Sequence, residues 1–366
     1  MIDLTFRSKH EYLQHEIKKM IKEQDMKPHD KLPSELEFQE KYNVSRHTVR
    51  TALSRLENQG IIYKEQGAGS FVSDGGQKSR TKEIGVITTY ISDYIFPTII
   101  RGIEKELTTA GYSMILTSTN NNVASEKNAI EMLVKREIDG LIVEPTKSAY
   151  YNSNIGTYLQ LKEMGIPIIM LNASYDEIET PTVMLDDFQA SYDLTKYLIE
   201  NGHTKIGGIM KIDDKQGKER LRGYIRACYE FGVEYNAQHV LVYETETLLE
   251  VLEQQAHPIV KNKAVTGFVC YNDKVAIEML NIIWQYGYAV PDDFSIVSHD
   301  NSSLSTMTKV HFTGINHPKS DLGEKAAKTL IDYIEGNIDK MEGTTFTGEF
   351  IENNSVRSII NNENLK

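Results

Sequence analysis

Hydrophobic residues in the first 73 positions follow helical spacing in three successive segments and then form two short runs separated by glycines. In the first segment the apolar stripe consists of Leu13, Ile17, Met20 and Ile21. Side chains at this spacing lie on one face of a helix and pack against a core. The pattern therefore predicts three helices followed by a two-stranded hairpin.

The second and third helices begin at residues that favour capping. Ser34 stands three residues before Glu37, which is the spacing of a capping box, and Asn43 ends the second helix. Ser45 caps the third helix, and one face of that helix is apolar. The apolar face consists of Val49, Ala52, Leu53 and Leu56. The opposite face carries Arg46, His47 and Arg50.

The basic face of the third helix favours DNA as its ligand. A guanidinium can bind guanine O6 and N7 together, or a phosphate in the same bidentate manner, while His47 and Thr48 can hydrogen-bond to either target. The first turns of such a helix enter a major groove. The sequence does not separate base contacts from phosphate contacts, and a merely solvated basic face is the alternative interpretation.

The hairpin is predicted to act as a wing. Its turn, QGAG, holds two glycines, which let the backbone approach a ligand closely. Gln66 at the tip can hydrogen-bond in a narrow groove, and Lys64 can meet a phosphate, as can Lys9 near the start of the first helix. The predicted DNA-binding residues are Lys9, Ser45, Arg46, His47, Thr48, Arg50, Lys64, Gln66 and Gly67.

These segments resemble a known family. The stretches KLPSE, VSRHTVRTAL, LENQGIIY and GAGSFV follow the pattern of the GntR-type winged helix-turn-helix repressors over residues 5–73. The resemblance implies a homodimer on double-stranded DNA that reads a pseudo-palindrome, with half-sites about one helical turn apart.

Beyond residue 73 the pattern changes to that of a larger α/β domain. Residues 74–82 are rich in Gly, Ser and charge, which predicts a flexible linker. From Ile84 onward, short apolar runs alternate with amphipathic helical stretches, as is typical of parallel sheets sandwiched by helices. The number of strand-sized runs exceeds one comfortable sheet, so we predict two lobes with a ligand cleft between them.

Polar and aromatic residues follow these predicted strands. Carboxylates, amides and an arginine can satisfy the hydroxyls of a small polyol, and an aromatic ring can cover its C–H face. The alternative is that such residues only form turns, above all at Asn120, Asn122 and Asp214, which stand in loops. The candidate ligand-binding residues are Tyr90, Tyr94, Phe96, Asn120, Glu144, Lys147, Asn172, Arg220, Asn272 and Asp300.

Other classes of function lack their sequence signals. The chain has no GxSxG or HExxH motif and no glycine-rich phosphate loop, so we expect no enzyme, no cofactor and no metal site. Cys228, Cys270 and the lone Trp284 are expected to be buried packing residues. No apolar run approaches the roughly 18 residues of a membrane span and no signal peptide is evident, so we expect a cytoplasmic protein without a membrane partner.

Charge is unevenly distributed along the chain. The net charge is −12, yet residues 1–80 carry 14 Lys and Arg against 12 Asp and Glu. DNA affinity must therefore come from a local patch and from two copies per dimer, because the overall field repels DNA.

The second domain also resembles a known family. The stretches DGLIVEP, NGHTKIGGI, RLRGYIRA, CYNDKVAIEML and VPDDFSIVSHDNS are similar to the LacI/GalR family of sugar-sensing repressors and their periplasmic relatives. This resemblance implies a two-lobed periplasmic-binding-protein-like domain over residues 83–366, after a winged helix-turn-helix domain over 1–73 and a linker over 74–82. It adds His317 to the ligand contacts. Ser298-His299 departs from the glycine-aromatic pair that the family usually has before Asp300.

The joining of these two domain types is similar to the arabinose-responsive repressors of Gram-positive bacteria, with TTYISDYIFP, STNNN, LIVEPTKSA and NASY as supporting stretches. The resemblance implies repression of arabinose uptake and catabolism genes, with release of operator DNA by L-arabinose. The residues themselves indicate only a small polar ligand, so a different sugar or a nucleoside is the alternative.

Overall fold

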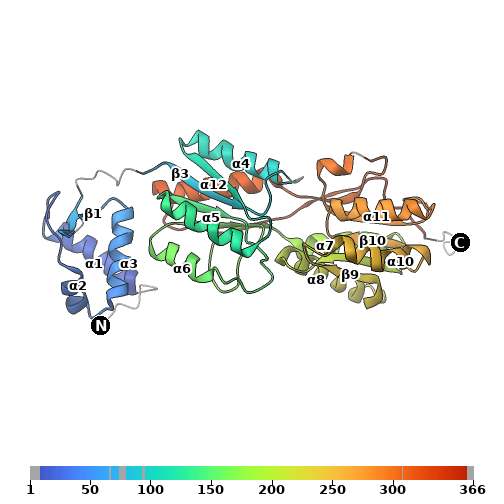
Figure 1. The fold of residues 1–366 in the computed structure, drawn as a ribbon, viewed down its shortest axis with the longest axis horizontal. Helices are drawn as coiled ribbons and strands as arrows, with labels where there is room; N and C mark the ends of the chain where they lie inside the picture. Colours follow the sequence, from blue (N-terminus) through green and yellow to red (C-terminus); the bar gives the residue numbers. More distant parts are fainter. Residues whose placement is uncertain (1–8, 66, 74–79, 93–94, 307, 361–366) are drawn as a thin grey trace.

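Three bodies follow one another along the long axis of the molecule in the computed structural model (Figure 1). They are an N-terminal domain, an N-terminal lobe and a C-terminal lobe. The structure describes residues 9–65, 67–73, 80–92, 95–306 and 308–360.

The N-terminal domain has three helices and a hairpin, as the hydrophobic pattern predicts. Its elements are α1 (Lys9–Glu23), α2 (Glu35–Tyr42), α3 (Arg46–Asn58), β1 (Ile62–Glu65) and β2 (Gly69–Val72), with β1 antiparallel to β2. The predicted apolar stripes of α1 and α3 share one core with Phe38 of α2. The domain therefore has a hydrophobic core of its own.

Both predicted helix caps are present. The Glu37 backbone N–H donates to Ser34 Oγ at 3.3 Å, and the Ser34 backbone N–H donates to the Glu37 carboxylate at 2.7 Å. Asn43 ends α2 in the left-handed conformation, with φ of 50°. The Thr48 backbone N–H donates to Ser45 Oγ at 3.2 Å. These local signals fix where α3 begins and hence which side chains stand on its first turn.

The N-terminal lobe is built on a parallel sheet with the strand order β13-β7-β6-β5-β3-β4. The strands are β3 (Glu83–Thr88), β4 (Ser113–Ser118), β5 (Gly140–Val143), β6 (Ile168–Leu171), β7 (Thr182–Leu185) and β13 (Thr344–Phe346). One face is covered by α4 (Phe96–Thr109) and α12 (Lys319–Glu335), the other by α5 (Val123–Lys135) and α6 (Ile155–Glu163) (Figure 1). Successive strand residues serve the two cores in turn, since Val86 packs under α4 and Ile87 under α5.

The C-terminal lobe repeats this plan with one antiparallel edge strand. Its sheet has the order β14-β12-β11-β10-β8-β9, and only the β12–β14 pair is antiparallel. The strands are β8 (Ile206–Lys211), β9 (Val240–Tyr243), β10 (Gly267–Cys270), β11 (Ser295–Asp300), β12 (Thr313–Asn316) and β14 (Glu349–Ile351). One face is covered by α7 (Asp187–Glu200) and α8 (Lys215–Glu230). The other is covered by α9 (Leu248–Val251), the π-helical turn η2 (Leu252–Ala256), α10 (His257–Lys261) and α11 (Asp273–Gln285).

The chain passes between the lobes three times. It crosses after β7, returns after β12 so that α12 packs on the N-terminal lobe, and crosses again between β13 and β14.

In each lobe, two helices pack so closely that their backbones are in contact. A Cβ on Gly323 of α12 would lie 2.2 Å from the Ile99 carbonyl oxygen, and one on Gly223 of α8 would lie 2.2 Å from that of Phe188. Glycine at these two positions lets the paired helices pack at backbone contact.

Three expectations about individual segments can be compared with the structure. Both cysteines are buried, as expected. The expectation for Trp284 is wrong: its side chain stands on α11 and is 47% exposed, because it falls on the outer face of that helix. In the predicted linker, Arg80 and Lys82 both bind the Glu335 carboxylate at 2.8 Å, so the C-terminal end of the linker is bound to α12.

Among the described residues, no helix combines the length and apolarity needed to cross a bilayer.

Candidate functional site

The predicted DNA-reading face of α3 is exposed and partly neutralised by one carboxylate. Arg46 Nε lies 3.2 Å from Glu35 of α2, and Arg50 Nε lies 3.4 Å from the other oxygen of the same carboxylate. Both guanidinium groups are about two-thirds exposed. Salt bridges this exposed are worth roughly 1 kcal/mol or less, so phosphates or base edges can replace Glu35 at low cost.

The same helix also contacts the N-terminal lobe. His47 Nε2 lies 3.1 Å from the Glu163 carboxylate at the end of α6, and Ser54 Oγ donates to the Met164 carbonyl at 3.0 Å. One ring nitrogen cannot bind Glu163 and DNA together. While this contact lasts, Nδ1 is the ring nitrogen of His47 that is left to bind DNA, and use of Nε2 requires that this end of α3 separates from α6.

The remaining predicted DNA contacts surround α3. Lys9 is exposed at the start of α1, and the hydroxyl groups of Ser45 and Thr48 lie 2.9 Å apart within the cap. Lys64 Nζ lies 3.6 Å from Glu57 of α3. Gly67 has φ of 78° and open space around its Cα, which suits close approach to a groove. Gln66 lies outside the described residues.

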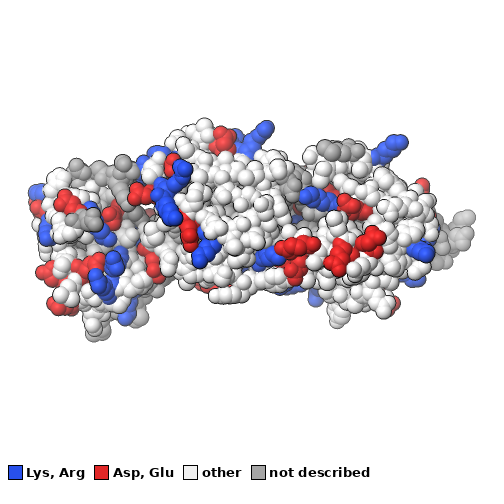
Figure 2. All heavy atoms as spheres, viewed as in Figure 1, with Lys and Arg blue, Asp and Glu red and all other residues white. Residues whose placement is uncertain are grey.

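The N-terminal domain, which we call the reading domain, carries both basic and acidic side chains on its surface. On the face seen in Figure 2, basic and acidic side chains alternate over this domain without a continuous basic stripe. This agrees with a net charge near zero for residues 1–80 and places the burden of phosphate binding on a small number of side chains.

A cleft of about 310 Å³ lies between the two lobes, at the carboxyl ends of their strands. Eight predicted ligand-binding residues line it, four from each lobe if His317, which follows β12, is counted with the C-terminal lobe. They are Tyr90, Phe96, Glu144 and Asn172, with Arg220, Asn272, Asp300 and His317. Ligands of parallel α/β sheets bind at this edge, so the location agrees with the strand topology.

On the N-terminal side, Glu144 organises the wall. This buried carboxylate accepts hydrogen bonds from Thr89 N at 2.9 Å and from Asn172 Nδ2 at 2.8 Å. Burial raises the pKa of Glu144, while the hydrogen bonds oppose that rise. Asn172 has φ of 60°, a left-handed conformation that asparagine tolerates better than most residues. Tyr90 and Phe96 meet edge to face with ring centroids 5.8 Å apart, so they offer an aromatic surface beside the polar wall.

On the C-terminal side, Arg220 is the central charge. Its guanidinium, 3% exposed as a residue, lies 2.7 Å from Asp187 and 3.3 Å from Asp300 and stacks over Tyr271. Asp300 has φ of 88°, and its carbonyl oxygen accepts from Lys319 Nζ at 2.6 Å. A left-handed aspartate costs on the order of 1–3 kcal/mol and persists only where its surroundings hold it. The site therefore presents a guanidinium and a carboxylate in fixed geometry.

Several polar atoms that line the cleft are buried and have no hydrogen-bond partner among the described residues. They are Asn172 Oδ1, Gln216 Oε1 and His317 Nδ1. Burial lowers the pKa of His317 to about 4, so its ring is neutral near pH 7. Buried polar atoms normally have partners, and a small ligand with several hydroxyl groups can donate to all three of these.

Two predicted contacts lie elsewhere. Asn120 is exposed and its side chain accepts from Ser118, while Lys147 points to carboxylates at the rim of the cleft. Neither is among the residues that line the cleft. Tyr94 lies outside the described residues. The sequence reasoning missed twelve lining residues as ligand contacts: Thr89, Ile95, Asn121, Pro145, Lys211, Asp214, Gln216, Tyr243, Thr245, Leu248, Tyr271 and Lys274.

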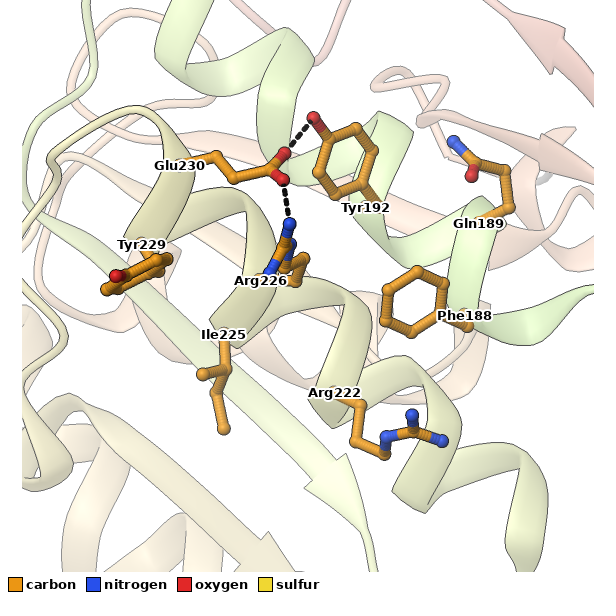
Figure 3. Close-up of a pocket in the computed structure, with 8 residues that line it drawn as sticks. All are labelled: Phe188, Gln189, Tyr192, Arg222, Ile225, Arg226, Tyr229 and Glu230. Atoms are coloured by element: carbon orange, nitrogen blue, oxygen red, sulfur yellow. Dashed lines mark hydrogen bonds and ion pairs between the residues drawn. The ribbon is translucent and has the colours of Figure 1, made fainter.

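A second hollow, the groove between α7 and α8, has a different character (Figure 3). It measures about 830 Å³ and is lined by Phe188, Tyr192, Arg226 and Glu230 among others. Glu230 binds Arg226 and accepts from Tyr192 at 2.6 Å, so its charges are neutralised within the groove. None of the predicted ligand-binding residues lines this groove.

One buried histidine next to the site gives a pH prediction. His299 Nδ1 lies 3.0 Å from the Cys270 carbonyl oxygen, and burial together with the charge of Arg220 lowers the pKa of His299 to about 3. Below its ordinary pKa near 6.5, the unfolded chain takes up a proton that the folded protein refuses. Stability is therefore full above pH 6.5 and falls with pH, by about 2 kcal/mol at pH 5 from this group alone.

His299→Phe is expected to remove that contribution. Urea unfolding of the wild-type protein and of the variant at pH 7.5, 6 and 5 gives the free energy of unfolding of each as a function of pH. The difference between the two pH dependences measures the contribution of His299, because the other titrating groups are the same in both proteins. Parallel slopes for the two proteins contradict the assignment.

Comparison with known proteins assigns each of the two parts of the chain to a known family. Residues 81–354 match the periplasmic binding proteins and sugar binding domain of the LacI family, and residues 9–72 match the bacterial regulatory proteins of the gntR family. The chain is 45% identical over 354 residues to the arabinose metabolism transcriptional repressor of Geobacillus stearothermophilus, covering 95% of this chain and 97% of that protein. It is 44% identical over 336 residues to the protein of the same name from Halalkalibacterium halodurans, covering 90% of each. Among solved structures, the transcription regulator CcpA of Lactococcus lactis has a TM-score of 0.66 at 27% identity and covers 76% of this chain and 100% of that chain.

Proposed function

Because this chain belongs to the bacterial transcriptional repressors that join a GntR-type DNA-binding domain to a LacI-type sugar-binding domain, we propose that it represses genes of arabinose uptake and catabolism. It binds operator DNA in the cytoplasm as a homodimer and leaves the operator when L-arabinose binds. It is a regulator and not an enzyme, and it needs no cofactor besides its effector.

The observation that carries the effector proposal is the composition of the interlobe cleft. Arg220 and Asp300 stand in it as a fixed donor and acceptor, and the atoms Asn172 Oδ1, Gln216 Oε1 and His317 Nδ1 lack partners among the described residues. An aldopentose offers alternating hydroxyl donors and acceptors around an apolar ring face, which Tyr90 and Phe96 can cover. The choice of arabinose among the pentoses is supported by the names of the two relatives that are 45% and 44% identical, which are both arabinose metabolism transcriptional repressors.

The homodimer is proposed from the match to the gntR-family and LacI-family regulators. Large exposed apolar side chains occur on all three bodies of the molecule, among them Leu36, Leu159 and Leu249. Such residues are normal on a protein surface when they are scattered singly, so they do not by themselves mark the dimer interface. Dimerisation would place two reading domains on one operator and double the number of phosphate contacts.

The mechanism follows from the position of the cleft. An effector held between two lobes favours one relative orientation of those lobes. A differential binding free energy of about 5.5 kcal/mol moves such an equilibrium from 1:99 to 99:1. In a dimer the reorientation moves the two reading domains relative to each other, so they no longer match both half-sites.

Gel mobility shift tests the proposal. We expect the protein to retard a DNA fragment from upstream of its own gene at fixed salt, and L-arabinose to release it, while D-ribose, D-xylose, D-galactose and adenosine do not. Release by one of those other compounds in place of L-arabinose would keep the regulator and assign a different sugar or a nucleoside as its effector. Absence of any retardation contradicts the DNA-binding proposal.

A further inference from the structure

A polar cluster joins the two lobes at the rim of the effector cleft. From the N-terminal lobe, Lys147 Nζ lies 2.9 Å from the Glu246 carboxylate, 3.7 Å from Asp213 and 3.8 Å from Glu244. All three carboxylates belong to the C-terminal lobe. We call the set of Asn121, Lys147, Asp213, Glu244, Thr245 and Glu246 the clasp.

The carboxylates of the clasp need a cation. Those of Asp213, Glu244 and Glu246 offer oxygen atoms that lie within 4.8 Å of one another, and Asp213 is fully buried. Like charges this close repel, and Lys147 is the group from the opposite lobe that reaches all of them. Lys211 of the same lobe neutralises Asp213 from behind, at 3.4 Å. The ammonium of Lys147 therefore holds the three carboxylates and the two lobes together.

Asn121 adds a second bond across the same gap. Its Oδ1 accepts from the Lys147 backbone N–H at 2.8 Å, and its Nδ2 donates to Asp213 at 3.3 Å and to Thr245 Oγ1 at 2.5 Å. Asn121 is 2% exposed and, like Thr245, also lines the effector cleft. The clasp is thus continuous with the cleft wall, and the side chain that links them is buried.

The backbone around Lys147 is held rigidly. Both Asn121 and Lys147 have positive φ, of 56° and 44°. The loop that carries Lys147 is anchored by Glu126, a fully buried carboxylate that accepts from Asn152 at 2.7 Å, among other donors. The same loop meets the opposite lobe again, where Ser148 Oγ accepts from the Lys215 backbone N–H at 3.0 Å. A loop fixed in this way presents the ammonium in one position.

We propose that Lys147 and Asn121 are positioning residues that hold the lobes together at the rim of the cleft, and so set the effector concentration at which the protein releases DNA. Lys147 does not line the cleft, so it acts through the lobe orientation and not by touching the effector. The statement about effector concentration rests on the proposed function, whereas the statement about lobe orientation does not.

Lys147→Met tests the proposal, because methionine keeps the length of the side chain and removes the charge. Fluorescent labels on K135C in the N-terminal lobe and K261C in the C-terminal lobe report the interlobe distance, since both lysines are exposed and both native cysteines are buried. Mixing with excess unlabelled protein leaves one labelled subunit per dimer. We expect longer distances in the effector-free Lys147→Met protein, and an L-arabinose affinity about tenfold weaker if the competent fraction falls to about a tenth.

Four further variants sharpen the result. Lys147→Arg keeps the charge and should restore both readouts in large part. Lys127→Met serves as the matched control, because Lys127 is exposed on the same lobe and pairs with Glu131 of its own helix, at 4.0 Å. Glu246→Gln and its combination with Lys147→Met close a double-mutant cycle, in which the two effects should be less than additive.

Unchanged distances in Lys147→Met would overturn the proposal. If affinity alone falls while distances stay the same, Lys147 is a direct effector contact and the clasp is again contradicted. A wild-type protein that binds no L-arabinose refutes the proposed effector, and the distance measurement still decides the clasp.

Discussion

Replacing Arg220 with alanine should abolish the response of operator binding to L-arabinose while the protein still binds operator DNA. The guanidinium is buried and lies within 3.3 Å of both Asp187 and Asp300. Without it the effector loses a charged donor in the cleft, and Asp300 loses the partner that positions it. We expect L-arabinose affinity to fall on the order of 100-fold, about 3 kcal/mol, as measured by titration calorimetry.

The same change also costs stability, because two buried carboxylates lose their counter-charge at a cost of about 3–5 kcal/mol. Thermal unfolding measures this loss. Arg220→Lys keeps the positive charge without the bidentate geometry, so it should fold and still respond weakly. Arg222→Ala is the matched control on the same helix, since Arg222 is exposed and pairs with Glu219 at 2.6 Å. Undiminished arabinose affinity in both Arg220 variants would remove this residue from the site.

Arg50→Ala should weaken operator binding on the order of 100-fold or more without altering L-arabinose binding. A single base or phosphate contact contributes about 1–3 kcal/mol, and a homodimer carries two copies of the residue. The side chain lies on α3 of a domain that has its own core, so the interlobe cleft is untouched. Gel mobility shift at fixed salt measures the operator affinity, and calorimetry measures the sugar affinity.

The salt dependence of the Arg50 variant separates the two kinds of DNA contact that the sequence leaves open. Loss of one phosphate contact per subunit lowers the salt slope by about 1 per contact, whereas loss of a base contact relaxes sequence preference at one position. Arg136→Ala, an exposed arginine of the N-terminal lobe, is the control and should leave the operator affinity as it is. Equal operator affinity of the Arg50 variant and wild type would contradict a role for α3 as the reading helix.

The reading domain could be predicted almost completely because its signals are local. Ser34 and Glu37 cap α2, Asn43 ends it, and Ser45 starts α3, each within four residues of its partner. The parallel sheets were also predictable, since apolar runs alternate with helical stretches. The antiparallel strand β14 was not, because its direction depends on the last crossing between the lobes and not on its own residues.

The cleft could be predicted only in part because two lobes build it. The sequence places Glu144, Asn172 and Asp300 at the ends of predicted strands, and all three line the cleft. Lys211 stands within a strand, so nothing local marks it as a lining residue. Asp214 follows a strand but also caps α8, so the sequence leaves a ligand role and a turn role both open. Lys147 was predicted as an effector contact, and its left-handed backbone turns the side chain toward the opposite lobe instead. Such directions depend on tertiary contacts.

The three crossings between the lobes also determine the order in which the protein can be completed during synthesis. The reading domain ends with β2 at Val72, whereas the last strand of the C-terminal lobe ends at Ile351, and the N-terminal lobe awaits α12 and β13. At about 5 to 20 residues per second, the roughly 280 residues between these points take about 15 to 55 s to synthesise. During that time a nascent chain carries a complete DNA-reading domain and no complete sensor. Each new molecule therefore becomes able to contact DNA before it becomes able to respond to its effector.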